Sequence, residues 1–293
     1  MHTEDFDSLV GTHAAGLTRR ALVRASVGSG FAAAVMPICA QTEVKTDSVG
    51  LITGEVTIPV GDFKMPAYRA APAQHRGAPV VLVLSEVFGV HEYIADVARR
   101  LAKAGYFAIA PELFVRQGDA SSYGEVAKLL AEVVNQVPDA QVMADLDASV
   151  AWARGQGADA AKLGVTGFCW GGRMTWLYAA HNPSVKAAVA WYGRLVGTAS
   201  ALTPKHAVDL TSKLHAPVLG LYGEKDTGIS LDTVAQMKQA LATGSAAARR
   251  SEFVVYPEAP HAFHADYRPT YRKPAADDGW ARCLAWFKTH GVA

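Results

Sequence analysis

The sequence predicts an α/β fold: a single domain over residues 45–293, with a mostly parallel central sheet flanked by helices. Three observations predict it. Short apolar runs rich in β-branched residues alternate with segments of helical spacing, which is typical of βαβ units. The runs are continuously apolar, which indicates strands buried on both faces. No internal repeat, low-complexity tract or Pro/Gly/Ser linker interrupts the chain after residue 45.

The predicted strands are short and apolar. Residues 53–60 and 63–70 are joined by Gly61 and Asp62, a pair of residues typical of a hairpin turn. Residues 79–84 (PVVLVL) are too few and too β-branched for a buried helix, so they are predicted as a strand. The further predicted strands are 106–110, 162–166, 185–191, 217–222 and 252–256.

Helical signals lie between these strands. Residues 93–104 carry apolar side chains at the i, i+3, i+4 and i+7 positions, which lie on one face of a helix. Residues 124–137 and 139–154 are predicted as two helices, because Pro138 breaks a helix and Asp139 is a typical cap for the second. The remaining predicted helices are 172–180, 231–241 and 275–289.

Length and composition exclude several classes of protein. The chain has 293 residues, of which 50% are hydrophobic and 19% charged, and this excludes a disordered or collagen-like chain. A chain of this length buries about three quarters of its unfolded surface, so we expect it to fold without a metal or a disulfide. Its net charge of +1, from 28 basic and 27 acidic residues, predicts neither nucleic acid nor anionic lipid as a partner.

Residues 1–40 have the pattern of an export signal. Arg19 and Arg20 precede a weakly apolar run at 25–36, and a small residue stands before the polar restart of the chain. The arginine pair with Leu22 resembles a twin-arginine signal, which implies the export machinery as a partner and a periplasmic or exported location. The run is too short to span a membrane, so we expect no stable insertion after signal removal. The alternative is an amphipathic N-terminus on a cytoplasmic protein.

A glycine-rich turn after the strand predicted at 162–166 carries a cysteine. Gly167, Cys169 and Gly171 form a G-x-C-x-G pattern between a strand and a helix, which is the nucleophile elbow with cysteine in place of serine. The glycines let neighbouring backbone pass where a Cβ would clash. The helix N-terminus beneath the sulfur favours a thiolate. The alternative interpretation is a buried structural cysteine.

Candidates for an acid and a base follow later strands. Asp226 is preferred to Glu224 as the acid, because Gly-x-x-Asp is the more usual spacing in this loop. His261 follows the last strand and is the expected base, with His264 as its rival. The chain order of nucleophile, acid and histidine matches that of α/β-hydrolases. The two histidines in His-x-x-His spacing are weak evidence for a metal site, and we predict neither a metal nor a cofactor.

Two backbone N–H groups are candidate donors to an oxyanion. The loop after residues 79–84 supplies one such donor in these folds, and here the candidate is the N–H of Val87. The second candidate is the N–H of Trp170, the residue after Cys169. Tyr192, which follows the strand predicted at 185–191, is predicted either to line the pocket or to pack as an aromatic residue at the edge of the core.

Five motifs together resemble the dienelactone hydrolase family (carboxymethylenebutenolidases). The combination of a cysteine elbow with Glu-x-Phe-Gly is quite specific to that family, and the match covers nearly the whole chain after the signal. The motifs are EVFG at 86–89, PELFVR at 111–116, GFCWGG at 167–172, GEKD at 223–226 and HAF at 261–263.

The resemblance implies an α/β-hydrolase fold, no cofactor, and hydrolysis of a small lactone or carboxylic ester by a Cys169–His261–Asp226 triad. It implies that Glu86 contacts the resting thiol and helps to activate it when substrate arrives. A carboxylate beside a thiolate is costly, so Glu86 is expected to keep the thiol protonated until then; the alternative is a solvated loop carboxylate. Arg116 stands at a family position that binds the substrate carboxylate. The resemblance also implies that the protein is a monomer.

The sequence departs from the family pattern at one position. Ala265 stands where the archetypal member has a second arginine, and Arg268, His264 and Tyr267 are the candidates to compensate. With one carboxylate-binding arginine missing, the sequence leaves the natural substrate open. Two alternatives therefore remain: a general esterase for neutral esters, for which Arg116 is incidental, and a thiol-based redox or binding protein on a hydrolase scaffold.

Overall fold

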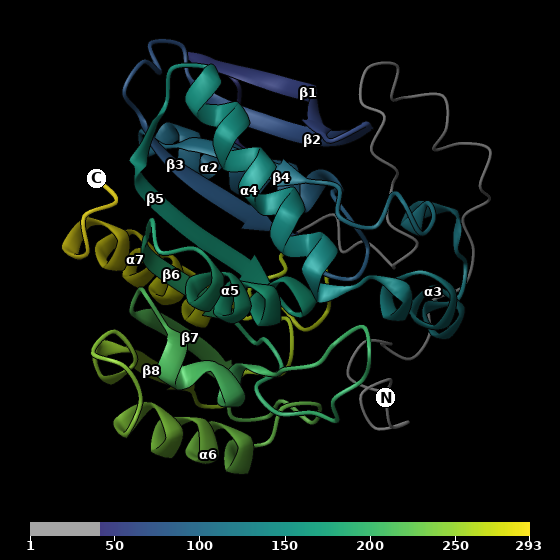
Figure 1. The fold of residues 1–293 in the computed structure, drawn as a ribbon, viewed down its shortest axis with the longest axis vertical. Coiled ribbons are helices and arrows are strands. Elements are labelled where there is room, and N and C mark those ends of the chain that lie inside the picture. The colour runs from purple at the N-terminus through teal and green to yellow at the C-terminus, as the bar shows by residue number, and fades with distance from the viewer. Residues whose placement is uncertain (1–41) are drawn as a thin grey trace.

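The computed structural model describes residues 42–293 as one eight-stranded sheet with helices on both faces (Figure 1). The strand order is β1-β2-β4-β3-β5-β6-β7-β8. The predicted export signal at 1–40 lies outside the described residues. In the described part of the chain, no helix combines the length and the hydropathy needed to cross a membrane.

The strands follow the apolar runs of the sequence, and every predicted strand is present. β1 and β2 form the predicted hairpin, β2 pairs antiparallel with β4, and the other neighbouring strands pair in parallel. The mostly parallel sheet of the prediction is therefore confirmed. The bounds are β1 Leu51–Val60, β2 Phe63–Pro72, β3 Pro79–Leu84, β4 Phe107–Pro111, β5 Asp159–Phe168, β6 Val185–Trp191, β7 Val218–Gly223 and β8 Glu252–Tyr256.

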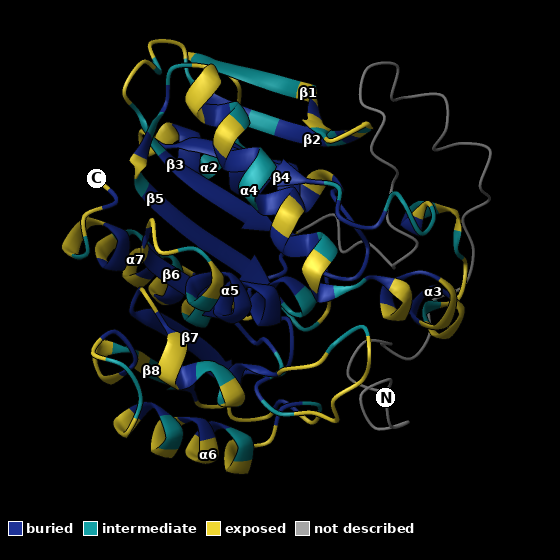
Figure 2. Cartoon of the chain, viewed as in Figure 1, coloured by how far each residue is buried: buried dark blue, intermediate teal, exposed yellow. Residues whose placement is uncertain are grey.

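The helices cover both faces of this sheet. Helices α4 and α5 lie over one face, and α2 and α7 lie over the other (Figure 1). The central strands are buried while the outer sides of the helices are exposed (Figure 2). The bounds are α2 Glu92–Lys103, α3 Val126–Glu132, α4 Asp139–Gly155, α5 Trp170–His181, α6 Leu231–Ala242 and α7 Lys273–Thr289.

The helix predicted at 124–137 is too long. Helix α3 ends at Glu132, and a 3-10 turn, Val134–Gln136, follows it. Between them, Val133 leaves the helical backbone conformation with φ −121° and ψ −67°, and its side chain is fully buried. The helix therefore ends where Val133 is buried in the core. The spacing of apolar residues in the sequence did not indicate this end.

The predicted capping role of Asp139 is wrong. Pro138 is the capping residue of α4, and Asp139 is the first residue of the helix. Its two carboxylate oxygens instead accept hydrogen bonds of 2.7 and 2.8 Å from the guanidinium of Arg173 on α5. This buried pair fixes the start of α4 against α5, the helix that follows Cys169.

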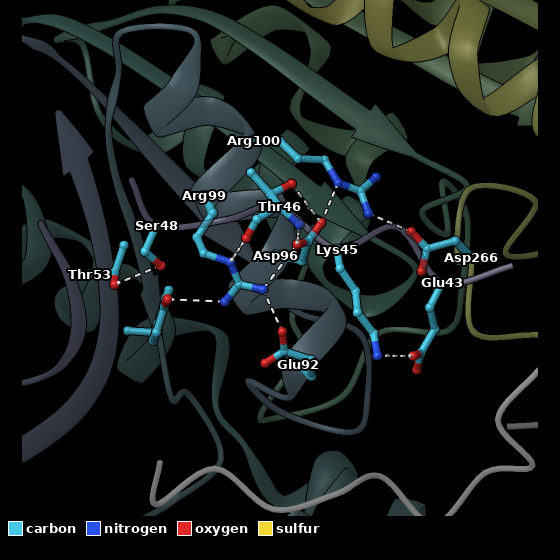
Figure 3. Close-up of polar contacts among 11 residues, drawn as sticks. Glu43, Lys45, Thr46, Ser48, Thr53, Glu92, Asp96, Arg99, Arg100 and Asp266 are labelled. Carbon is cyan, nitrogen blue, oxygen red and sulfur yellow. Dashed lines mark hydrogen bonds and ion pairs between the residues drawn. The ribbon is translucent and has the colours of Figure 1, made fainter. Parts of the chain in front are cut away.

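The segment that precedes β1 is bound to α2 (Figure 3). The N–H of Thr46 donates to Asp96 (2.6 Å), and the carbonyl of Thr46 accepts from Nε of Arg99 (3.0 Å). Arg100 donates to Asp96 and also to Asp266, which lies in the loop after β8, each at 2.5 Å. This segment, which directly follows the predicted signal, is therefore part of the folded domain.

The parallel strands end at one edge of the sheet. The loops after β3, β5, β7 and β8 carry Glu86, Cys169, Asp226 and His261 respectively. Parallel α/β sheets place their sites at the carboxyl ends of the strands, so residues far apart in the sequence meet at this edge.

Candidate active site

Cys169 occupies a sharp turn between β5 and α5. Its backbone has φ 54° and ψ −113°, a conformation that is strained for a residue with a Cβ. A Cβ at Gly167 would overlap the carbonyl of Gly171, and a Cβ at Gly171 would overlap the carbonyl of Leu84. The two glycines are therefore required for the turn to pack against the end of β3. Cys169 itself remains partly exposed at the tip of the turn.

Asp226 and His261 are joined by a short hydrogen bond. The distance from Oδ2 of Asp226 to Nδ1 of His261 is 2.7 Å, and both side chains are buried. The other oxygen of Asp226 accepts from the N–H groups of Gly228 (2.9 Å) and Ile229 (3.1 Å). These two N–H groups hold the carboxylate through Oδ1, so that Oδ2 is in place to orient the imidazole ring.

The His261 ring lies between two groups that favour its protonated form. Burial alone lowers the pKa of His261, but the Asp226 carboxylate opposes this most strongly and Cys169 adds to the opposition. The pKa of His261 therefore lies well above its usual range. Its Nε2 is buried and has no hydrogen-bond partner among the described residues, so it is available to a reacting group.

The two rival residues have other partners. His264 bonds through Nδ1 to the hydroxyl of Tyr93 (2.7 Å) and packs against Trp191, with 4.4 Å between the ring centroids. Burial, followed by the charge of Arg100, lowers the pKa of His264 well below its usual range, so this ring is neutral at pH 7. Glu224 is more exposed and faces Lys225, at 3.9 Å. Asp226 and His261 are therefore the pair that the fold brings together.

Glu86 is buried beside Tyr267, His91 and Arg268. Its Oε2 accepts from the hydroxyl of Tyr267 (2.7 Å) and lies 3.7 Å from Nε2 of His91. Burial raises the pKa of Glu86, but His91, Arg268 and Tyr267 together outweigh it and the net pKa is lowered. The carboxylate is thus ionised at neutral pH. Its Oε1 is buried without a hydrogen-bond partner in the described part of the chain, and a contact with the Cys169 thiol remains a prediction.

The two candidate oxyanion donors lie in adjoining loops. Val87 is buried in the loop after β3, and Trp170 is the first residue of α5. The loops are joined by a hydrogen bond of 3.1 Å from the N–H of Gly171 to the carbonyl of Ser85. The N–H of a first helical residue has no partner within its own helix. Among the described residues, the backbone hydrogen bonds leave the N–H groups of Val87 and Trp170 without an acceptor.

Arg116 is already paired within the protein. Its guanidinium donates two hydrogen bonds to Asp145 on α4, at 2.5 and 2.7 Å, and lies over the ring of Phe63 at 4.0 Å. The Asp145 side chain is fully buried. The sequence alone did not indicate this partner, because 29 residues separate the two positions and several other acids lie between them.

Tyr192 and Arg268 both lie near the reacting groups. Tyr192 is fully buried with φ 38°, and its ring meets that of His261 edge-on at a centroid distance of 5.1 Å. Its hydroxyl has no hydrogen-bond partner among the described residues. Arg268 is 3% exposed, lies 6.0 Å from the ring of Phe88 and helps to lower the pKa of Glu86. Tyr192 therefore contacts the proposed base, and Arg268 lies close enough to Glu86 for its charge to act on the carboxylate.

Comparison with known proteins decides the family. A model of the dienelactone hydrolase family matches residues 65–291. The chain belongs to the dienelactone hydrolase family. It is 60% identical over 278 residues to a "Putative carboxymethylenebutenolidase" from Methylorubrum extorquens, covering 94% of each chain. It is 52% identical over 264 residues to one so named from Escherichia coli K12, covering 90% of this chain and 96% of the relative.

A solved structure supports the same assignment. The crystal structure of a "Putative Dienelactone Hydrolase" from Klebsiella pneumoniae has 57% sequence identity and a TM-score of 0.79, and the match covers 81% of this chain and 98% of that one. The predicted α/β-hydrolase fold is thereby confirmed. The chain is an enzyme of the dienelactone hydrolase type, from a family that acts on small lactones and esters.

Some residues around this dienelactone hydrolase site were not singled out from the sequence. His91 and Tyr93 belong to the loop and helix after β3, and they contact Glu86 and His264. Glu112 follows β4 and is partly buried beside the loop that carries Val87, where it accepts from the N–H of Val90. Glu112 belongs to the PELFVR motif and directly follows a predicted strand, and this position was the sequence signal that could have identified it as a site residue.

Proposed function

We propose that this dienelactone hydrolase family member cleaves a lactone or carboxylic ester with Cys169 as nucleophile, His261 as general base and Asp226 as the residue that orients His261. The observation that carries the proposal is the buried Asp226–His261 hydrogen bond beside a cysteine held in an elbow conformation. An imidazolium beside the sulfur stabilises the thiolate, which is the reactive form of cysteine.

The first half of the reaction forms an acyl-enzyme. The Cys169 sulfur attacks the carbonyl carbon, and the N–H groups of Val87 and Trp170 hold the negative charge that develops on the carbonyl oxygen. The carbon–oxygen bond of the ester or lactone then breaks. The leaving oxygen takes the proton that His261 carries on Nε2, which leaves a thioester on Cys169.

The second half releases the acid. His261 takes a proton from water, and the hydroxide oxygen attacks the thioester carbonyl. The carbon–sulfur bond breaks, the acid product departs, and the sulfur returns to the thiolate beside protonated His261. Asp226 stays ionised throughout and holds the ring in the required orientation.

A panel of lactones and aryl esters, with and without a carboxylate, tests this proposal on the wild type and on Cys169→Ser. We expect turnover by the wild type and a large loss in the serine variant, because a hydroxyl is far less acidic than a thiol and His261 must then remove its proton during the attack. If the protein were instead a thiol-based redox or binding protein on a hydrolase scaffold, no substrate would be turned over and Cys169 would be oxidised reversibly.

A specific observation favours neutral esters as the second candidate for the substrate class. Because Arg116 is held by Asp145 and Phe63, we expect Arg116→Ala to change KM for anionic and neutral esters alike, by less than about threefold. Steady-state kinetics on matched ester pairs measures this. If KM rises about tenfold for anionic esters alone, Arg116 binds the substrate carboxylate as the family resemblance implies.

Asp145→Asn is the matched variant. It removes the charge opposite Arg116 and keeps the shape of the side chain. A lower KM for anionic esters in this variant would mean that Asp145 normally competes with the substrate for Arg116. An unchanged KM agrees with neutral substrates, for which Arg116 is incidental.

We also propose that residues 1–40 direct export to the periplasm. Two features support it: the arginine pair ahead of a short apolar run, and the absence of an acid between Thr18 and Gln41. N-terminal sequencing of the protein purified from its native host should find a start near Gln41, after a cut that follows Ala40. A start at Met1 or His2 would contradict export and favour the cytoplasm.

A further inference from the structure

Glu112 is a partly buried residue with one carboxylate oxygen, Oε1, shielded from solvent, and the proposed mechanism does not use it. It is the residue after β4, and its N–H donates to the carbonyl of Pro66 on β2 at 2.9 Å, which fixes its backbone. Strands β3 and β4 pair in parallel, so their carboxyl ends lie side by side. The side chain of Glu112 therefore meets the loop that leaves β3, which carries Val87.

The carboxylate holds this loop at one backbone group. Oε2 of Glu112 accepts from the N–H of Val90 at 2.8 Å, and the N–H of Gly89 closes the turn onto the carbonyl of Glu86 at 3.3 Å. A Cβ at Gly89 would lie 2.7 Å from Oε2 and 2.9 Å from Oε1, and its φ is +75°. Glycine at position 89 thus permits both the turn and the close approach of the carboxylate.

The two carboxylate oxygens of Glu112 differ in their hydrogen bonds, because Oε2 accepts from Val90. Its Oε1 is shielded from solvent and has no hydrogen-bond partner in the part of the chain that the structure describes. Burial raises the pKa of Glu112 to about 7, the N–H groups of Val90 and Phe114 oppose the rise, and the charge of Asp119 adds to it. A shielded polar atom without a hydrogen-bond partner costs stability, which points to a role for Glu112 beyond packing.

We propose that Glu112 is a positioning residue for the oxyanion hole. By holding the N–H of Val90 it fixes the turn over 86–90, and this turn directs the N–H of Val87 at the carbonyl oxygen of the substrate. The inference rests on the proposed function. An oxyanion donor must already be in place when charge develops, so a small displacement of the turn lowers the rate without weakening ground-state binding.

Two substitutions of Glu112 separate its acceptor from its charge. Glu112→Ala removes the acceptor for Val90, and we expect kcat on a neutral aryl ester to fall about tenfold to a hundredfold with KM nearly unchanged. Glu112→Gln keeps a carbonyl oxygen at the same place, so it should hold kcat within about threefold of the wild type. Asp119→Asn, on the same loop, is the matched control and should leave kcat unchanged, because among the described residues Asp119 bonds to its own turn at Ser121 and Ser122.

Amide hydrogen exchange gives a second readout that does not depend on turnover. In Glu112→Ala, exchange over residues 85–90 should accelerate, while exchange over β5 in the same molecule should not. If the alanine variant does not fold, Glu112→Asp, with a shorter side chain that withdraws the carboxylate from the N–H of Val90, replaces it in both assays. Three results would overturn the proposal. They are a kcat of Glu112→Ala within twofold of the wild type, an equal loss of kcat in Glu112→Ala and Glu112→Gln, and unchanged exchange over residues 85–90 in Glu112→Ala.

The failure of the proposed function is distinguishable from that of this inference. If the wild type hydrolyses no ester or lactone, the assigned reaction fails, and the exchange experiment still decides whether Glu112 holds the turn. If the wild type is active and Cys169→Ala is not, the reaction stands, and the kinetics of the two Glu112 variants decide the role of this residue.

Discussion

Cys169→Ala should lower the hydrolysis of aryl esters and lactones by about 10⁴-fold or more, because a serine or cysteine nucleophile and its histidine act as a unit and neither works without the other. The residual rate would come from the oxyanion donors and from substrate binding alone. Initial rates at several enzyme concentrations measure the loss. The acyl-enzyme should also disappear, which mass spectrometry of the protein mixed with a slow ester detects.

The second cysteine of the described chain provides the control. Cys283 is fully buried, and burial raises the pKa of its thiol far above the usual range, so it is unreactive at neutral pH. Cys283→Ala should retain turnover, and iodoacetamide should inactivate it as it inactivates the wild type. Full activity of Cys169→Ala, or loss of activity only in Cys283→Ala, would remove Cys169 as the nucleophile.

Asp226→Asn should lower kcat/KM by about 10³- to 10⁴-fold. The amide keeps the size of the side chain and an oxygen for the N–H groups of Gly228 and Ile229, but it no longer offers a carboxylate to Nδ1 of His261. The ring then loses both its fixed orientation and the charge that stabilises its protonated form. Steady-state kinetics and the pH dependence of kcat/KM measure the two effects.

Asp226→Asn should also change how the free energy of unfolding depends on pH. His261 has a raised pKa in the folded state, so its contribution to the free energy of unfolding is fully present below its unfolded pKa of about 6.5 and is lost as the pH rises through its folded pKa. Asp226→Asn should therefore lose more unfolding free energy at pH 6 than at pH 9. Urea unfolding at the two pH values measures the difference.

A neighbouring carboxylate on the same loop is the matched control for Asp226. Glu224 is partly exposed and faces Lys225 rather than the imidazole. Glu224→Gln should leave both kcat/KM and the pH dependence of stability unchanged. If Glu224→Gln had the larger kinetic effect, the acid would be Glu224 and the role given to Asp226 would fall.

The sheet was predictable because its signals are local. A run such as 79–84 has the length and β-branched content of a strand whatever surrounds it, and β3 has the predicted bounds. The failures occurred where packing between distant elements decides. Val133 ends α3 early because its side chain enters the core, and Asp139 faces Arg173 instead of its own helix end.

The candidate site divides in the same way. The elbow at Cys169 could be identified from the sequence, because glycines two residues before and after it are a local requirement of the turn. The environment of Glu86 could not. Its carboxylate meets Tyr267, 181 positions away, and no periodicity or motif links the two residues.

Local sequence patterns are enough to predict the order of strands and helices, the family resemblance and the loops that carry Cys169, Asp226 and His261. Apolar runs, glycine spacing and chain order suffice for these, since each is a property of a short segment. Two pairings are visible only in the folded chain: His261 rather than His264 meets Asp226, and Arg116 is held by a buried acid. These pairings depend on how loops from different strands pack at the carboxyl ends of the sheet, because the direction and burial of each side chain set its distance from its partner.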